Sequence, residues 1–317
     1  MTSERAAALV KQRALALGFD AAGVADLTPS RYAQALDRWL DGGMAAGMHY
    51  MKRQARRRKH PEEILAGAVR AVMVTKHYLT PDPPAQACRG RVAKYARGRD
   101  YHKAVGKPLE LLADYVQALG PPGTIARPYV DAGPVPEREL AARAGLGWIG
   151  KNTLLIDPAR GSLCFLGAVL TSLDLAPDLP FAADRCGSCR KCLEACPTGA
   201  LIEDRVLDAR LCISYWTIEH RGAFPPTVST GDWLFGCDAC QDVCPWNERF
   251  AAEPTDDMLE PEPALASLDV REVATATDAE LTRRFGWTGL RRAGPEALRR
   301  NARAVLRHQE TAQGPDL

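Results

Sequence analysis

The spacing of apolar residues predicts the first elements of the chain. Over residues 4–17 Ala, Leu and Val recur at helical spacing, and the run ends at Gly18, a residue that often caps a helix. Helices and strands interleave over residues 1–175, as in an α+β sheet domain. The other predicted helices cover 31–41, 101–119 and 137–144, and the predicted strands cover 19–25, 71–75 and 126–130. Residues 154–156 and 165–170 are expected to form two paired strands with a turn at Asp157, Pro158 and Gly161.

Two changes in composition divide the chain into three predicted parts. A proline-containing stretch at 176–180 precedes a cysteine-rich segment, and a Pro-Glu-Pro sequence begins at Pro261 after it. We therefore expect an α+β fold with an N-terminal α/β sheet domain (1–178), a two-cluster ferredoxin-like domain (179–250) and a short helical C-terminal region (251–317). Pro295 suits the first turn of a final helix. Its apolar stripe would consist of Leu298, Ala302, Val305 and Leu306.

Eight of the ten cysteines form two linked runs. The first run is Cys186-x2-Cys189-x2-Cys192-x3-Cys196-Pro197, and the second is Cys237-x2-Cys240-x3-Cys244-Pro245, with Cys212 ahead of it. In bacterial ferredoxins three closely spaced thiolates bind one [4Fe–4S] cluster, and a fourth, before proline, binds the other cluster. This rule predicts that Cys186, Cys189, Cys192 and Cys244 hold cluster one. It assigns cluster two to Cys196, Cys212, Cys237 and Cys240.

Zinc and disulfides are the alternative uses of these cysteines. Four-cysteine zinc sites have similar CxxC spacings, but they need neither a third cysteine at x2 nor a following x3-Cys-Pro. A disulfide framework is typical of secreted proteins, and we see no secretory signal in the opening residues 1–5. The pattern therefore favours iron–sulfur clusters and electron transfer.

Composition and charge set the broad class. Hydrophobic residues make up 46% and charged residues 25% of the chain, as in ordinary soluble globular proteins. No apolar stretch approaches the roughly 18 residues that cross a bilayer, so we expect a cytoplasmic protein without a membrane partner. The formal net charge is only +2, but basic residues cluster over 52–60, over 89–103 and near the C-terminus. Local patches of this kind can bind the phosphates of a large polyanion.

The cluster ligands are separated by an insertion. A segment that begins Cys212-Ile213-Ser214-Tyr215-Trp216-Thr217-Ile218-Glu219 intervenes before the chain returns to Cys237. A loop held between ligands stays close to its cluster. The aromatic pair in it favours an interface with the large domain or with a substrate over a surface insertion without a role.

Several motifs together resemble the epoxyqueuosine reductase family. They are Tyr95-Ala-Arg-Gly-Arg-Asp-Tyr-His102, Tyr129-Val-Asp-Ala-Gly-Pro134, Ala144-Gly-Leu-Gly-Trp-Ile-Gly-Lys-Asn152, the 212–219 segment and the cysteine runs. The resemblance covers about residues 5 to 307. It implies a cobalamin-binding N-terminal domain, cobalamin and two [4Fe–4S] clusters as cofactors, and reduction of epoxyqueuosine to queuosine at the wobble position of tRNA. Some members carry a longer C-terminal region, whereas this chain has only a short tail.

The resemblance implies that Asp131 is the general acid. Cob(I)alamin would supply the electrons that remove the epoxide oxygen, and a carboxylic acid would protonate that oxygen. A carboxyl group donates a proton near neutral pH only if its surroundings raise its pKa, and the apolar neighbours Val130, Pro134 and Val135 are compatible with such burial. Without the resemblance, Asp131 would be interpreted as a turn residue.

The resemblance also implies a cobalamin pocket. Its lining would comprise Arg58, Ala93, Asp131, Leu155, Leu166, Ser214 and Asp238, although Leu155 and Leu166 would otherwise be interpreted as ordinary core residues. Asp100, His102 and Gly106 approximate an Asp-x-His-x-x-Gly signature for an axial histidine ligand, but the glycine comes one position late. The family binds cobalamin without an axial histidine, so His102 is expected to be structural or near the substrate.

Two other functions remain open from the sequence. A cobalamin-dependent reductive dehalogenase of a small organohalide would share the redox parts, but such enzymes usually have an export signal and a tyrosine acid. A ferredoxin fused to a binding module would carry electrons without catalysis and would not bind a corrinoid. For the tRNA enzyme we expect a low-potential flavodoxin or ferredoxin as electron donor, and a monomer.

Overall fold

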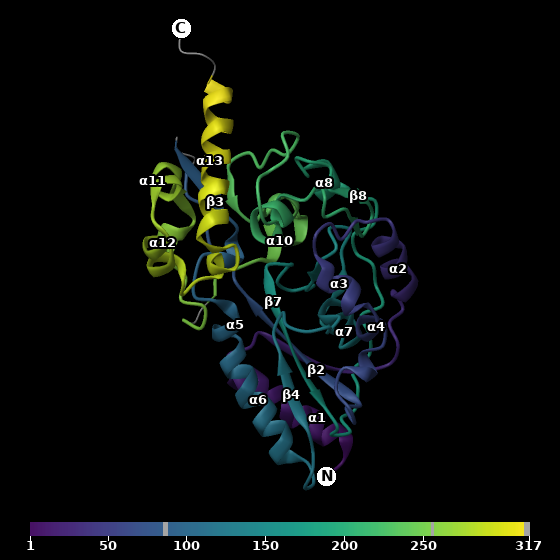
Figure 1. Ribbon diagram of the computed structural model, residues 1–317. Coiled ribbons are helices and arrows are strands. Elements are labelled where there is room, and N and C mark those ends of the chain that lie inside the picture. The colour runs from purple at the N-terminus through teal and green to yellow at the C-terminus, as the bar shows by residue number, and fades with distance from the viewer. Residues whose placement is uncertain (85–87, 255–256, 314–317) are drawn as a thin grey trace.

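The computed structural model describes residues 1–84, 88–254 and 257–313. A four-stranded antiparallel sheet in the order β1-β2-β7-β4 forms the centre of the N-terminal half (Figure 1). Its strands are β1 (Ala21–Asp26), β2 (Arg70–His77), β7 (Cys164–Thr171) and β4 (Ala126–Tyr129). The strands predicted near 19–25, 71–75, 126–130 and 165–170 are therefore confirmed, with small differences at their ends.

Helices cover both faces of this sheet because its central strands are apolar on both sides. Val72 and Val74 of β2 belong to a core packed against α1 (Ser3–Ala16) and α6 (Gly106–Leu119). Their neighbours Ala71 and Met73 belong to a second core packed against α7 (Glu137–Arg143). Successive side chains of a strand point to opposite faces, so a continuous apolar run is what a sheet covered on both sides requires.

The helical predictions are confirmed with one correction. Helix α1 ends at Ala16, and Gly18 follows its C-cap with a left-handed backbone, φ +92°, as expected for a residue that stops a helix. The single helix predicted over 101–119 is wrong, because the structure has α5 (Tyr101–Ala104), a junction at Val105, and then α6. Pro108 lies in the first turn of α6 and has no N–H to donate to the carbonyl of Ala104, so one continuous helix cannot pass through it.

The pairing predicted for residues 154–156 and 165–170 is also wrong. Strand β7 already pairs with β2 along one edge and with β4 along the other. The short strand β6 (Leu155–Ile156) pairs instead with β5 (Trp148–Ile149). The predicted turn does form, and it is closed by a bridge between Asp157 and Gly161.

The C-terminal region forms a second core with earlier parts of the chain. Its sheet has the order β10-β3-β11 and takes β3 (Arg89–Val92), β10 (Trp233–Phe235) and β11 (Ser267–Asp269) from the three predicted parts in turn. Helix α13 (Gly294–Gln313) packs on β10 and runs to the upper end of the molecule in Figure 1. The stripe predicted for this helix is confirmed, because Leu298, Ala302 and Val305 are buried and Leu306 packs against them. The three parts thus share a sheet, and their boundaries stay a prediction.

The remaining elements are short. Those of the N-terminal half are α2 (Ala33–Asp41), α3 (His49–Arg53), α4 (Ala55–Lys59), η1 (Pro61–Glu63) and η2 (Lys94–Ala96). The cysteine segment contains α8 (Lys191–Glu194), β8 (Leu201–Glu203), β9 (Val206–Leu207), η3 (Tyr215–Glu219), α9 (Ala239–Asp242) and α10 (Pro245–Phe250). The C-terminal region adds η4 (Pro263–Leu265), α11 (Val270–Thr275), α12 (Asp278–Phe285) and η5 (Gly289–Arg292).

Within the described residues, every helix is too short or too polar to cross a membrane.

Candidate active site and cluster-binding segment

Asp131 lies in the loop between β4 and α7 with a left-handed backbone, φ +45°. A left-handed conformation is unfavourable for a residue other than glycine, and it persists only where neighbouring contacts hold it. The backbone N–H of Asp131 donates to Oε1 of Glu137 at 2.8 Å, and the hydroxyl of Tyr101 donates to Oδ2 of Asp131. The Asp131 side chain is exposed, so the burial expected from the sequence is absent. Two partners, one from α7 and one from α5, hold the loop.

Tyr101 is fixed by aromatic packing. Its ring lies 4.5 Å from the ring of Phe165 with an interplanar angle of 9°, and the ring of Tyr95 meets its edge at 6.0 Å. Burial, followed by the charge of Asp131, raises the pKa of Tyr101 well above its ordinary value. Tyr101 therefore stays protonated and keeps its hydroxyl as a hydrogen-bond donor to Asp131.

Glu137 is a site residue that sequence reasoning missed. It is the first residue of α7, where an acidic side chain ordinarily indicates only the favourable end of a helix. Burial, followed by the negative charge of Asp131, raises the pKa of Glu137 to about 8. A carboxyl group that is largely protonated at neutral pH can lie beside Asp131 without strong repulsion between two negative charges.

Arg58 reaches the same loop from α4. One guanidinium nitrogen donates to the carbonyl of Gly133 at 3.1 Å and to Oε1 of Gln54 at 3.0 Å. Burial lowers the pKa of Arg58. Its Nε is buried and has no hydrogen-bond partner among the described residues. An unpaired buried donor is costly, so this nitrogen fits an acceptor atom of a bound group.

Ala93 and Asp238 are brought close together by a backbone hydrogen bond. The N–H of Lys94, next to Ala93, donates to Oδ2 of Asp238 at 2.7 Å. Asp238 is 1% exposed, and burial raises its pKa to about 6. The ring of Tyr95 lies 6.0 Å from that of Tyr101 and 6.1 Å from that of Phe235, and burial, followed by the charge of Asp131, raises the pKa of Tyr95. The structure therefore places Arg58 on the loop of Asp131, and it places Asp238 against the backbone next to Ala93.

The other three residues suggested for the pocket have different surroundings. Leu155 is buried in the core beneath α7, and Leu166 packs against the same core. Ser214 comes directly before η3, and its hydroxyl hydrogen-bonds the thiol of Cys212. Among the described residues, no contact joins the side chain of Leu155, Leu166 or Ser214 to Asp131.

The thiols of Cys186, Cys189, Cys192 and Cys244 line one cavity of about 210 Å³. Burial, then the proximity of Cys186 and Cys244, raises the pKa of Cys192. The indole N–H of Trp148 donates to Sγ of Cys186 at 3.4 Å. Hydrogen bonds to the sulfur ligands tune the potential of a cluster. These four thiols are therefore grouped as the ferredoxin rule expects.

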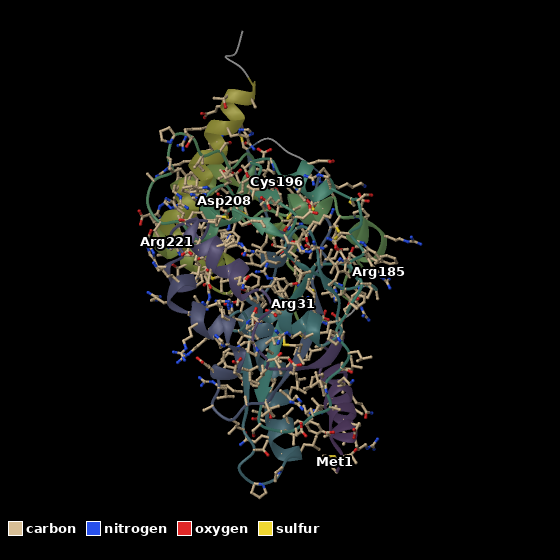
Figure 2. The ribbon with its side chains drawn as sticks, turned by 90° about the vertical axis from the view of Figure 1, so that its right-hand side faces the viewer. Met1, Arg31, Arg185, Cys196, Asp208 and Arg221 are labelled. Carbon is tan, nitrogen blue, oxygen red and sulfur yellow. The ribbon has the colours of Figure 1, made fainter. Side chains whose placement is uncertain are left out.

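A second group of thiols consists of Cys196, Cys212, Cys237 and Cys240. Burial, then the nearby thiols of Cys237 and Cys212, raises the pKa of Cys240. Burial also raises the pKa values of Cys212 and Cys237, to which the charge of Cys196 adds. The N–H of Ala200 donates to Sγ of Cys196 at 3.2 Å. In Figure 2 Cys196 lies in the upper part of the molecule and Arg185, next to the first group, lies towards its edge. Among the described residues, no group of three or more His, Cys, Asp or Glu side chains is arranged to bind one metal ion.

The insertion between Cys212 and Cys237 is tied to both neighbouring parts. The hydroxyl of Tyr215 accepts a hydrogen bond from the N–H of Gly47 at 2.9 Å, so the insertion contacts the N-terminal half. Arg292 forms a two-point ion pair with Glu219, with both N–O distances 3.1 Å. Arg221, labelled in Figure 2, donates to the carbonyl of Arg292. The expected interface with the large domain is present, and the C-terminal region fastens the other side.

Asn301 of α13 makes the most buried of these contacts. Its Nδ2 donates to the carbonyls of Thr217 and Leu234, each at 2.9 Å, and the side chain is 0% exposed. The Thr217 hydroxyl in turn accepts from the N–H of Gly236, the residue before Cys237. One buried amide thus connects the insertion to the strand that leads into the second group of thiols.

Comparisons with known proteins agree with this geometry. Residues 58–132 match the family model "Epoxyqueuosine reductase QueG, DUF1730", and residues 185–247 match "4Fe-4S double cluster binding domain". The second match includes all eight cysteines of the two groups, and it shows a domain for two [4Fe–4S] clusters. The mixed α+β fold with a cluster domain in its C-terminal half is thereby confirmed.

Relatives and solved structures match nearly the whole chain. The epoxyqueuosine reductase of Gloeobacter violaceus is 41% identical over 308 residues, which are 95% of each chain. That of Pseudomonas aeruginosa is 39% identical over 94% of this chain and 84% of its own. A crystal structure of epoxyqueuosine reductase with an epoxyqueuosine-modified tRNA stem loop has a TM-score of 0.87 and 29% identity, over 96% of this chain and 82% of that one. The enzyme from Bacillus subtilis gives a TM-score of 0.84 at 28% identity, with the same two coverages. The chain belongs to the epoxyqueuosine reductase family.

Proposed function

We propose that this oxidoreductase reduces the epoxide of epoxyqueuosine in tRNA to the alkene of queuosine. The observation that carries the proposal is the position of Asp131, an exposed carboxyl group held by Tyr101 and Glu137 in a loop that Arg58 also contacts. The double-cluster segment supplies electrons in the same chain. Removal of an epoxide oxygen as water consumes two electrons and two protons, so a proton donor and an electron path are both required.

Asp131 is the proposed general acid. Its exposed carboxyl group can approach the epoxide oxygen of a bound nucleoside, and the nucleoside that covers it would supply the burial that the general-acid role requires. When it gives up a proton, the Tyr101 hydroxyl stabilises the resulting carboxylate by the hydrogen bond to Oδ2. The Glu137 bond to the Asp131 N–H keeps the carboxyl group at the mouth of the site. Asp131 then takes a proton from solvent, so that it can supply the second proton of the water that leaves and be ready for the next turnover.

Two sets of four thiolates would hold the clusters. We assign Cys186, Cys189, Cys192 and Cys244 to cluster one, because they line one cavity. Cluster two is assigned to the second group of thiols, Cys196, Cys212, Cys237 and Cys240. The cysteine run proposed for cluster one includes the exposed residues Gly187 and Ser188, whereas the insertion lies between two of the cysteines proposed for cluster two. Electrons would therefore enter at cluster one and leave towards the active site from cluster two.

Cobalamin would bind at the same site. When bound, it supplies a strongly reducing cobalt centre for the two-electron step. The unpaired Nε of Arg58 is free to donate to one of its polar groups, and Ala93, Ser214 and Asp238 would contact it from the side of the insertion. Leu155 and Leu166 would support the pocket from the core beneath α7.

The partners follow from the chemistry. The related crystal structure contains an epoxyqueuosine-modified tRNA stem loop, and tRNA carrying epoxyqueuosine is the substrate proposed for this chain. A low-potential carrier of flavodoxin or ferredoxin type would reduce the clusters. We place the reaction in the cytoplasm, where tRNA is modified, and propose that the enzyme acts as a monomer.

Cells test this function directly. Deletion of the gene in a host without a second such enzyme should leave epoxyqueuosine in its tRNA, and the wild-type gene should restore queuosine. The Asp131→Asn gene should not restore it, although the protein accumulates to the same level. Normal queuosine in the deletion strain would overturn the proposal.

A further inference from the structure

Three aromatic rings form a stack that runs from the core to the surface beside Asp131. Phe165 of β7 is buried, and its ring lies 4.5 Å from that of Tyr101. The ring of His102 lies 4.2 Å from Tyr101, at an interplanar angle of 29°. Two rings this close and nearly parallel to Tyr101 cannot share one face of it, so His102 covers the face that Phe165 leaves free. The His102 side chain is 40% exposed and forms the outer end of the stack.

The orientation of the His102 ring is fixed. Its Nδ1 lies 2.9 Å from Oδ1 of Asp100, a carboxylate only 2% exposed. Nε of Arg291 lies 2.7 Å from the other oxygen of Asp100. The backbone N–H of His102 already bonds Asp100 and caps α5, so the start of the helix does not need the ring. The extra bond from the ring, with Arg291 behind it, holds an exposed aromatic plane in one position.

The surface around this plane is basic and contains another aromatic side chain. Lys103 is exposed, and the Arg291 side chain is 50% exposed. Trp287 is 42% exposed, and its carbonyl accepts a hydrogen bond from the N–H of Asp100. Exposed aromatic rings among cations are the features by which proteins bind single-stranded nucleic acid, since bases stack on the rings and phosphates contact the cations.

We propose that His102 is a stacking platform for a nucleobase next to the modified nucleoside, with Lys103 and Arg291 placed for the adjoining phosphates. The inference rests on the proposed function. The hydroxyl of Tyr101, the middle ring of the stack, bonds the proposed general acid Asp131, and His102 continues the stack towards the surface. A base on His102 would be the fourth ring of the series. It would hold the neighbouring nucleotide while the modified base enters the site at Asp131.

Binding of a synthetic anticodon stem loop tests the proposal. Fluorescence anisotropy under anaerobic conditions would compare the cluster-loaded wild-type protein with His102→Ala and His102→Phe. Loss of the platform should raise Kd about tenfold, because stacking of one base on an aromatic side chain is worth ~1–3 kcal/mol. His102→Phe keeps a ring and should bind within about threefold of wild type. His308→Ala, an exposed histidine far along α13, is the matched control and should leave Kd unchanged.

A fluorescent base gives a second readout. 2-Aminopurine placed at either neighbour of the wobble position should be quenched on binding to wild type and to His102→Phe, and not on binding to His102→Ala. Tight binding of wild type and His102→Ala alike, with equal quenching, would overturn the inference and leave the proposed function standing. Failure of the wild-type protein to bind the stem loop at all would overturn both.

Discussion

The backbone N–H of Asp131 donates to Oε1 of Glu137 at 2.8 Å, which fastens the Asp131 loop to the first turn of α7. Because the Asp131 backbone is left-handed, with φ +45°, this bond helps to hold an otherwise unfavourable conformation. Glu137 bonds the backbone and not the carboxyl group of Asp131. It is therefore a positioning residue, and the proton transfer itself is assigned to Asp131.

Asp131→Asn should abolish most of the turnover. The amide keeps the size of the side chain and can still accept from Tyr101, but it has no acidic proton to give. General acid catalysis is worth about a hundredfold to ten-thousandfold, so the rate should fall at least about a hundredfold. Single-turnover assays would measure the rate, while the Kd for the stem loop and the cluster absorbance stay at wild-type values. A rate within about threefold of wild type would remove Asp131 from its role.

The stability of the protein should depend on pH through Glu137. Its pKa is raised from 4.5 to about 8 in the folded protein, so the folded state holds a proton that the unfolded state releases. The stability that this bound proton contributes to the folded state is fully present below pH 4.5 and is lost as the pH rises through 8. Its slope cannot exceed about 1.4 kcal/mol per pH unit. Glu137→Gln mimics the protonated form and removes the dependence.

Thermal unfolding of the wild type and of Glu137→Gln at pH 5.5, 7 and 8.5 would measure this dependence. The difference between their two unfolding midpoints should change with pH. The midpoint of wild type should fall relative to Glu137→Gln as the pH rises. Glu63→Gln is the matched control, because Glu63 is an exposed carboxylate whose ion pair with Arg56 lowers its pKa. Parallel curves for wild type and Glu137→Gln would contradict the protonated state of Glu137.

The two groups of thiols should be separable by substitution. Cys189→Ala removes one proposed ligand of cluster one, so the reconstituted protein should lose about half of its iron and keep the electron paramagnetic resonance signal of cluster two. Cys240→Ala should do the reverse. Cys164→Ala, which changes a thiol in β7, should keep all of the iron. A single substitution that abolishes neither signal, or equal spectra from Cys189→Ala and Cys240→Ala, would contradict the assignment.

Asn301→Ala should destabilise the protein and disturb cluster two. The substitution leaves the buried carbonyls of Thr217 and Leu234 without their donor, at a cost of about 1–3 kcal/mol for each unsatisfied group. Unfolding in guanidinium would measure the loss. Arg307→Ala, at an exposed position of the same helix, should change the free energy of unfolding by less than about 0.5 kcal/mol. Equal stability of the two variants would contradict the proposed role of Asn301 in connecting the insertion to β10.

Elements with a local cause could be predicted from the sequence. The helix that ends at Gly18, the strand at 71–75 and the stripe of the last helix depend on nearby residues, and the structure confirms them. The cysteine spacing is equally local, since short loops must wrap a cluster. The family match over residues 185–247 confirms the double-cluster domain that this spacing predicts.

Long-range choices could not be predicted. Whether 165–170 pairs with 154–156 depends on β2 and β4, which occupy both edges of β7. The sheet built from β3, β10 and β11 joins segments far apart in the chain, and no local pattern indicates it. Glu137 looked like an ordinary first-turn residue. Its role depends on where the loop places the Asp131 N–H, which only the fold determines.

Anaerobic turnover tests the central claim most directly. Cluster-reconstituted protein would be combined with cobalamin, a low-potential reductant and tRNA containing epoxyqueuosine, and the digested nucleosides would be identified by mass spectrometry. We expect queuosine only when cobalamin is present, and none from Asp131→Asn in the same mixture. No queuosine from wild-type protein with full iron and bound cobalamin would contradict the account.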